Sequence, residues 1–97
     1  MIIAADIGNT FIHFGLFDQK ELIAKFELSS ALPRSCDEYF IFLSSMLIGK
    51  ETPDASIISS VVPSVTDPVR LALKRITGYD PIIVGPGVKT GFNIKLD

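Results

Sequence analysis

The feature that most constrains this chain is the pattern of residues 1–17, in which two apolar runs flank a Gly-Asn-Thr turn. The first run ends at Asp6 and the second begins at Phe11. Short apolar runs bounded by a turn signal predict two β-strands, and a turn this tight would pair them antiparallel. Asp6 is therefore expected at the end of the first strand, beside the turn.

This turn has the chemistry of a metal–phosphate site. Gly8 lacks a Cβ, so it can adopt a positive φ and allow a close approach to the backbone. Asn9 tolerates the left-handed region and Thr10 supplies a hydroxyl. Successive amides in such a turn can bind an anion, and a carboxylate such as Asp6 suits Mg²⁺, which usually arrives with phosphates. The alternative is an ordinary hairpin in which Asp6 only shapes the turn.

The periodicity of the whole chain predicts an α/β fold with a mixed sheet and the element order β-β-β-α-β-α-β. The first three strands are expected to form an antiparallel meander. The expected strands are Ile2–Asp6, Phe11–Phe17, Glu21–Leu28, Ala55–Val62 and Ile82–Val84, and the expected helices are Cys36–Ile48 and Thr66–Thr77.

Both expected helices carry boundary signals. Ser35 and Glu38 have the spacing of a capping box at the start of the first helix. Ser64 or Thr66 is expected to cap the second helix, and Gly78 is expected to end it.

Composition limits the class of protein. The chain has 97 residues, 47% of them hydrophobic and 21% charged, which is typical of one globular domain. A net charge of −2 without a basic run argues against nucleic acid as a partner. One cysteine excludes an intrachain disulfide. No apolar run approaches the ~18 residues of a membrane span, and a signal-peptide pattern is absent. We expect a cytoplasmic protein without a membrane partner.

Two other polar groups invite a catalytic interpretation. His13 is the only histidine, and a structural histidine satisfied by a hydrogen bond competes with a role at the phosphate site. Ser59 and Ser60 end an apolar run, but no Gly-x-Ser-x-Gly elbow surrounds them. A Ser-His-Asp hydrolase is therefore disfavoured.

A glycine-rich segment at residues 85–91 is similar to a phosphate loop but fails the test for a Walker A motif. Such a motif has Gly immediately before Lys-Ser/Thr and is followed by a helix. Here Val88 precedes Lys89, and the residues that follow favour an extended chain. A plain connector and a part of a substrate pocket both remain open interpretations.

Three segments of the chain, taken together, resemble type III pantothenate kinases, a family of the actin-like ATPase and sugar kinase superfamily. They are Asp6-Ile-Gly-Asn-Thr10 with Gly15-x-Phe17, Ser59-Ser-Val-Val-Pro63, and Gly85-Pro-Gly-x-Lys89-Thr-Gly91-x-x-Ile94. The resemblance implies a ribonuclease H-like (actin-like ATPase) lobe.

The resemblance also implies an activity: ATP-dependent phosphorylation of pantothenate to 4′-phosphopantothenate, the first step of coenzyme A biosynthesis. It implies Mg²⁺, a monovalent cation (K⁺ or NH₄⁺) and a homodimer. Carried over by residue, Asp6 is the catalytic residue and the metal ligand. The residues implied to bind ATP are Asp6, Ile7, Gly8, Asn9, Thr10, Phe11, Ile12 and His13.

The chain departs from the family in length. Family members continue with an Asn-Pro-x-x-Val-Gly-Ala-Asp-Arg motif, which carries the general base, and with a second phosphate motif; these 97 residues contain neither. We therefore expect residues 1–97 to be the N-terminal lobe of a two-lobe kinase, truncated before the second lobe and inactive alone. A non-catalytic accessory relative, or a lobe of another actin-like small-molecule kinase such as a sugar or acetate kinase, is the alternative.

Overall fold

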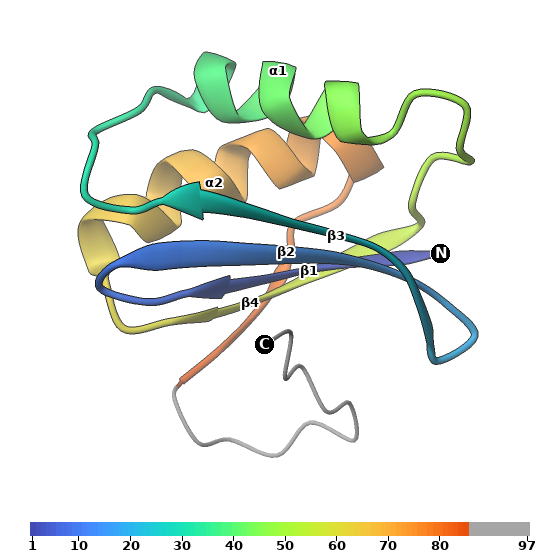
Figure 1. The fold of residues 1–97 in the computed structure, drawn as a ribbon, viewed down its shortest axis with the longest axis horizontal. Coiled ribbons are helices and arrows are strands. Elements are labelled where there is room, and N and C mark those ends of the chain that lie inside the picture. Colours follow the sequence, from blue (N-terminus) through green and yellow to red (C-terminus); the bar gives the residue numbers. More distant parts are fainter. Residues whose placement is uncertain (86–97) are drawn as a thin grey trace.

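The computed structural model describes residues 1–85, which form a sheet with two helices packed on one of its faces (Figure 1). The element order matches the expected β-β-β-α-β-α-β pattern. In chain order the elements are β1 (Ile2–Ile7), β2 (Phe11–Asp18), β3 (Glu21–Ser29), α1 (Cys36–Met46), β4 (Ala55–Ser60), α2 (Pro63–Thr77) and β5 (Ile82–Val84).

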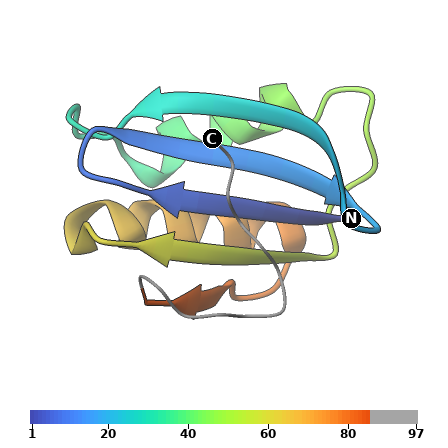
Figure 2. The same cartoon turned by 60° about the horizontal axis from the view of Figure 1, so that its bottom comes forward.

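The sheet is mixed, with the strand order β3-β2-β1-β4-β5 (Figure 2). β1, β2 and β3 form the expected antiparallel meander, whereas β4 pairs parallel to β1 and β5 pairs parallel to β4. The parallel pairs require crossover connections, and α1 and α2 provide them. β1 lies in the middle of the sheet, so its apolar run suits a strand with neighbours on both sides.

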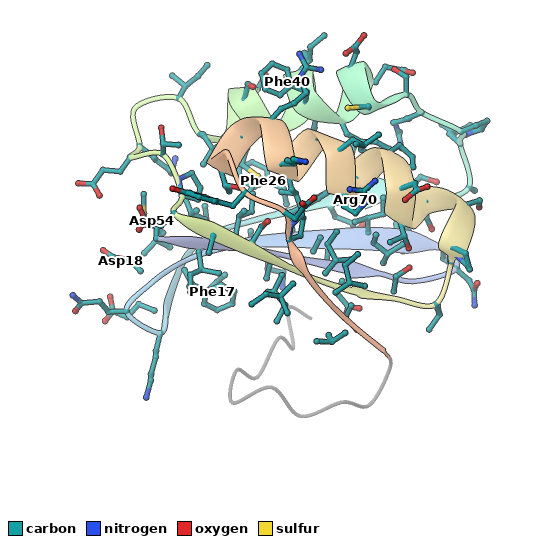
Figure 3. All side chains as sticks on the ribbon, turned by 180° about the vertical axis from the view of Figure 1, so that it is seen from behind. Phe17, Asp18, Phe26, Phe40, Asp54 and Arg70 are labelled. Carbon is teal, nitrogen blue, oxygen red and sulfur yellow. The ribbon has the colours of Figure 1, made fainter. Side chains whose placement is uncertain are left out.

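The hydrophobic core lies between the sheet and the helices. On β2, Ile12, Phe14 and Leu16 are fully buried there, while Phe11 on the opposite face is 42% exposed. Figure 3 shows Phe17 on the side of the sheet away from the helices, which we call the distal face. The buried residues that form the core are Ile3, Ala5, Ile7, Ile12, Phe14, Leu16, Tyr39, Leu43, Met46, Ile58, Val65, Val69, Ala72 and Leu73.

Helix α1 begins where the capping box predicts. The Glu38 amide donates to Ser35 Oγ at 3.1 Å, and the Ser35 amide donates to Glu38 Oε1 at 2.9 Å. The helix ends at Met46 rather than at the expected Ile48, which is 78% exposed. The apolar pattern therefore predicted a helix two residues too long. An exposed Ile48 contributes no packing energy that would prolong the helix.

Helix α2 begins at Pro63, three residues earlier than expected, and β4 ends at Ser60 rather than at Val62. The N-cap is Val62, without a side-chain cap, so the expectation that Ser64 or Thr66 caps this helix was wrong. Proline needs no amide partner in a first turn and its φ already suits a helix, which explains the early start. The helix ends as expected at Gly78, whose φ is +85°.

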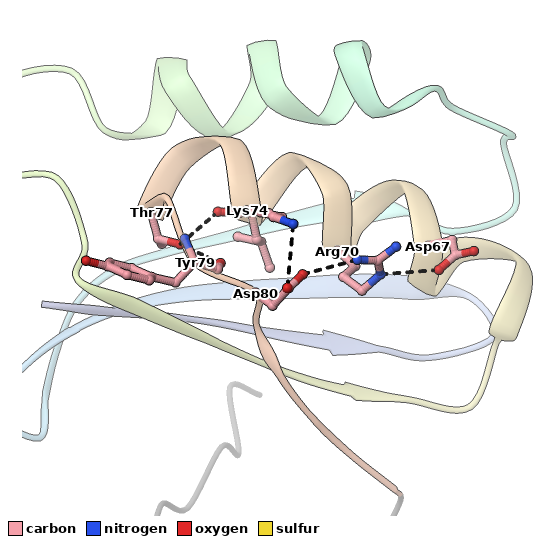
Figure 4. A network of polar contacts seen from close by, with 7 residues as sticks. Asp67, Arg70, Lys74, Thr77, Tyr79 and Asp80 are labelled. Atoms are coloured by element: carbon pink, nitrogen blue, oxygen red, sulfur yellow. Dashed lines mark hydrogen bonds and ion pairs between the residues drawn. The ribbon is translucent and has the colours of Figure 1, made fainter.

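Polar contacts fix α2 against its neighbours. Arg75 forms an ion pair of 2.6 Å with Asp37 on α1, and this hydrogen bond raises the pKa of Arg75. Asp80 lies just before β5. Its Oδ1 atom is 3.2 Å from Arg70 Nη1 and its Oδ2 atom is 3.5 Å from Lys74 Nζ (Figure 4). Exposed ion pairs stabilise a fold only weakly, so we interpret them as orienting the chain between α2 and β5. In the part of the chain that the structure describes, neither helix is long and apolar enough to cross a membrane.

Candidate phosphate and metal site

The carboxyl ends of β1 and β4 lie at the same edge of the sheet because the two strands are parallel and adjacent. Ile7 at the end of β1 is in register with Ser60 at the end of β4. The amide of Val61 donates to the carbonyl of Ile7 at 3.1 Å, which holds the two strand ends together. Ligands of α/β sheets bind at the carboxyl ends of the strands, so this edge is the expected place for a site.

The turn at residues 8–10 is held by a hydrogen bond across itself and by hydrogen bonds to the residue that follows β3. The Gly8 amide donates to the Phe11 carbonyl at 2.9 Å. Ser30 holds the turn from outside: its amide donates to the Thr10 carbonyl at 2.9 Å and its hydroxyl donates to the Gly8 carbonyl at 2.7 Å. The turn is therefore fixed by three hydrogen bonds before any ligand binds.

The turn does not use the left-handed conformations that Gly8 and Asn9 permit. Among the described residues, positive φ occurs at Gln19 and Lys20 and at two glycines elsewhere in the chain, not in this turn. The constraint on Gly8 is steric instead, because a Cβ there would lie 3.3 Å from the Phe11 carbonyl oxygen. The amide of Gly8 is already used within the turn, so the amides of Asn9 and Thr10 are the candidates for binding a ligand.

A row of polar side chains crosses the distal face at this edge. Asp6 on β1 is in register with His13 on β2 and with Ser59 on β4, and His13 is in register with Glu27 on β3. Residues in register on neighbouring strands share a face of the sheet. We call Glu27, His13, Asp6 and Ser59 the polar row.

His13 lies inside this row without a hydrogen bond at one ring nitrogen. Its Nδ1 atom is buried, has no hydrogen-bond partner among residues 1–85, and lies 3.6 Å from Glu27 Oε2. The ring also contacts Phe11 edge-on, at 6.3 Å between centroids. The interpretation of His13 as satisfied by one hydrogen bond therefore does not hold at Nδ1.

The predicted ATP-binding segment divides between two faces. Ile7 and Ile12 are 1% and 0% exposed and belong to the core, so only their backbone can meet a ligand. Asp6 and His13 belong to the polar row, and the turn lies beyond the strand end. The alternation of β1 and β2 thus leaves Asp6, residues 8–11 and His13 as the part of the predicted site that faces outward.

Mg²⁺ fits this donor set. In the described range, residues 1–85, no group of three or more His, Cys, Asp or Glu side chains gathers to hold a metal. Mg²⁺ does not need such a cage, because it is usually bound through one or two carboxylates together with water and substrate phosphates. Asp6 would supply the carboxylate, and the Thr10 hydroxyl lies in the adjoining turn.

The sequence did not predict the roles of three residues in this region. Ser30 fixes the turn, Glu27 faces His13, and Ser59 lies beside Asp6. The predicted meander could have indicated the positions of Ser30 and Glu27. A short hairpin after β2 places β3 alongside the whole of β2, and therefore places these two residues beside the turn and beside His13. Nothing in the sequence signals that β4 adds next to β1. Of the glycine-rich segment, residues 86–91 lie outside the described residues.

A hollow of about 260 Å³ lies beside Ser30 and is lined by residues 30–34 and the first turns of α2. Its polar lining includes Arg34 and Ser64, but no carboxylate. Because it involves neither Asp6 nor the turn at residues 8–10, the strand edge with the polar row is the candidate site.

Solved structures identify the fold of this chain. The structure matches the ROK hexokinase of Thermus thermophilus with a TM-score of 0.59 and 18% identity, over 87% of this chain and 34% of that chain. It matches a ROK family glucokinase of Streptomyces griseus, solved with glucose and AMPPNP, with a TM-score of 0.56 and 15% identity, over 87% and 32% of the two chains. The chain therefore has the actin-like ATPase fold of the matched part of these sugar kinases.

Within that class, the sequence identifies a particular family. The family model for type III pantothenate kinase matches residues 2–97, and the chain belongs to this family. It is 39% identical over 101 aligned residues to the type III pantothenate kinase of Bifidobacterium animalis subsp. lactis (strain AD011). The alignment covers 100% of this chain and 40% of that relative, so the chain spans about two fifths of the relative's length.

Proposed function

We propose that the full-length protein phosphorylates pantothenate with ATP, and that this chain supplies the lobe that binds the ATP phosphates. The reaction gives 4′-phosphopantothenate and ADP, the first step of coenzyme A biosynthesis. One observation carries the proposal: in a member of this family, Asp6 lies at the carboxyl end of β1 beside a turn that Ser30 has already fixed.

The described residues would act by positioning and by charge. Phosphoryl transfer depends mainly on holding the phosphates in line and on neutralising the charge of their oxygens. The amides of Asn9 and Thr10 would bind phosphate oxygens, and Asp6 would orient Mg²⁺, which supplies the neutralising charge. Because the turn is fixed before ATP binds, little ordering cost remains to be met by the binding energy.

The acceptor half of the reaction needs groups outside the described lobe. The pantothenate hydroxyl attacks the γ-phosphorus, the bond to the β–γ bridging oxygen breaks, and the hydroxyl proton passes to a base. The family resemblance assigns that base to a segment that follows the matched region in relatives. A monovalent cation (K⁺ or NH₄⁺), a homodimer and a cytoplasmic location belong to the proposal on the same resemblance.

A coupled assay that measures ADP release by the full-length protein tests this function. We expect release to depend on pantothenate and Mg²⁺, and mass spectrometry to show 4′-phosphopantothenate. Glucose, N-acetylglucosamine and acetate serve as matched acceptors for the alternative kinases. Turnover with one of these but not with pantothenate would overturn the proposal, and nucleotide binding without any turnover would favour the accessory relative.

A further inference from the structure

Ser59 lies beside Asp6 although the two residues are far apart in the sequence. β1 and β4 are parallel neighbours, and Asp6 and Ser59 are register partners. Adjacent strands lie ~4.8 Å apart and partners on one face point the same way, so the Ser59 hydroxyl lies within reach of whatever the Asp6 carboxylate holds. Both side chains are half-buried on the distal face.

The neighbouring serine provides an internal comparison. Ser60 points to the opposite face and its hydroxyl is fully engaged at the start of α2. Ser60 Oγ accepts from the Val62 amide at 3.0 Å and from Thr66 Oγ1 at 2.7 Å, and it donates to the Val62 carbonyl at 3.2 Å. Ser59, by contrast, forms no hydrogen bond through its hydroxyl in the described structure. One serine stabilises the fold, and the other presents a donor toward the candidate site.

From this difference we propose that Ser59 is a positioning residue of the phosphoryl-transfer site, a role that rests on the proposed function. Its hydroxyl hydrogen-bonds either the Asp6 carboxylate or a water in the hydration shell of Mg²⁺. Mg²⁺ keeps several of its waters when a protein binds it. Groups that orient metal ligands typically change metal affinity 10–100-fold when they are removed.

The test uses the full-length protein and three variants: Ser59→Ala, Ser59→Thr and Ser60→Ala. The first removes the hydroxyl at the site, the second keeps a hydroxyl at the same place, and the third removes the hydroxyl that holds α2. Mn²⁺ serves as the probe of the metal site, with binding measured by electron paramagnetic resonance in the presence of AMPPNP. Thermal melting and the Mg²⁺ dependence of ADP release are measured in parallel.

We expect Ser59→Ala to weaken Mn²⁺ binding about 10-fold, and to raise the Mg²⁺ concentration for half-maximal turnover, without lowering the melting temperature. Ser59→Thr should restore most of the Mn²⁺ affinity. Ser60→Ala should lower the melting temperature and leave Mn²⁺ binding unchanged.

Three outcomes would overturn the role of Ser59. They are unchanged Mn²⁺ binding in Ser59→Ala, equal losses in Ser59→Ala and Ser59→Thr, or no Mn²⁺ binding by the wild-type protein with AMPPNP. If Mn²⁺ binding follows the expected order but pantothenate is not phosphorylated, the proposed function fails and the role of Ser59 stands. The two proposals are therefore separated by independent measurements.

Discussion

At the scale of single residues, the site depends on the position of Asp6 between two neighbouring strands. It is in register with His13 on one side and Ser59 on the other, at the carboxyl end of the central strand. The core residues that precede and follow it on the other face, Ala5 and Ile7, are 0% and 1% exposed and fix the strand. Asp6 is thus held on a rigid element, while its carboxylate is directed to the distal face.

We expect Asp6→Asn to lower kcat of the full-length protein by about 10²–10³-fold, the range seen when one electrostatic group at a transition state is removed. Asparagine keeps the shape of the side chain but removes the charge that orients Mg²⁺. Steady-state kinetics at saturating Mg²⁺ test this, with a thermal melt to show that the fold persists. Asp18→Asn, the same change at an exposed position at the opposite end of β2, is the matched control and should retain activity. Near-wild-type turnover by Asp6→Asn would reject the metal role.

Ser30 offers a second test at the residue scale. Ser30→Ala loses the 2.7 Å hydrogen bond to the Gly8 carbonyl, which should cost about 1 kcal/mol of unfolding free energy. The KM for ATP should rise, because the turn at residues 8–10 is less fixed. Ser29→Ala is the control, since the Ser29 hydroxyl, at the end of β3, accepts from the amide of Ala31 at 3.2 Å in an exposed contact outside the turn. Equal effects of the two variants on KM would contradict a turn fixed by Ser30.

At the scale of elements, a helix begins or ends at a capping residue where the sequence supplies one. α1 begins at a capping box and α2 ends at Gly78 in a left-handed conformation. The start of α2 has no side-chain cap, and Ser60 of the preceding strand holds it instead. This contact joins α2 to the carboxyl end of β4, one residue beyond Ser59.

Ser35→Ala tests the capping box of α1. It removes the acceptor of the Glu38 amide, and such substitutions typically cost about 1 kcal/mol. Urea denaturation of the full-length protein should show this loss. Ser45→Ala is the matched control, because Ser45 is a serine within the same helix whose hydroxyl donates to the Ile41 carbonyl at 2.9 Å. Alanine favours helix more than serine does, so this variant should be neutral or slightly stabilising. A larger loss for Ser45→Ala would contradict the assignment of the cap.

At the scale of the whole molecule, residues 1–85 form one folded unit of a chain that belongs to a kinase family. The sheet, the two helices and the turn form a self-consistent unit with its own core. The candidate site lies at an edge and on a face of this sheet. A phosphoryl-transfer site must enclose both phosphates and acceptor, so we infer that the full-length protein completes it from outside this lobe.

We therefore expect the purified 97-residue chain not to phosphorylate pantothenate. Loss of a general base alone typically costs ~10²–10⁴-fold in rate, and the second phosphate motif is missing as well. The coupled assay that is used for the full-length protein decides this. Circular dichroism of the same sample serves as the control that the isolated chain is folded. Turnover comparable to that of the full-length protein would contradict the lobe interpretation.

The local features of this fold were predictable from the sequence. Runs of apolar residues between turn signals located every strand, and the capping box at Ser35 and the glycine at position 78 located two helix ends. Asp6 at a strand end beside the Gly-Asn-Thr turn was predictable for the same reason. These features depend on interactions between residues close in sequence, so the periodicity and spacing of the residues predict them.

Only the tertiary structure decided which strands are neighbours and which residues face each other. The pairing of β4 with β1 brings Ser59 beside Asp6, and the return of β3 brings the Ser30 hydroxyl to the Gly8 carbonyl. The backbone of the turn also differs from the left-handed conformation that its residues permit. The physical reason is that register and turn geometry are set by packing against the helices and by hydrogen bonds between distant segments, neither of which local sequence preference specifies.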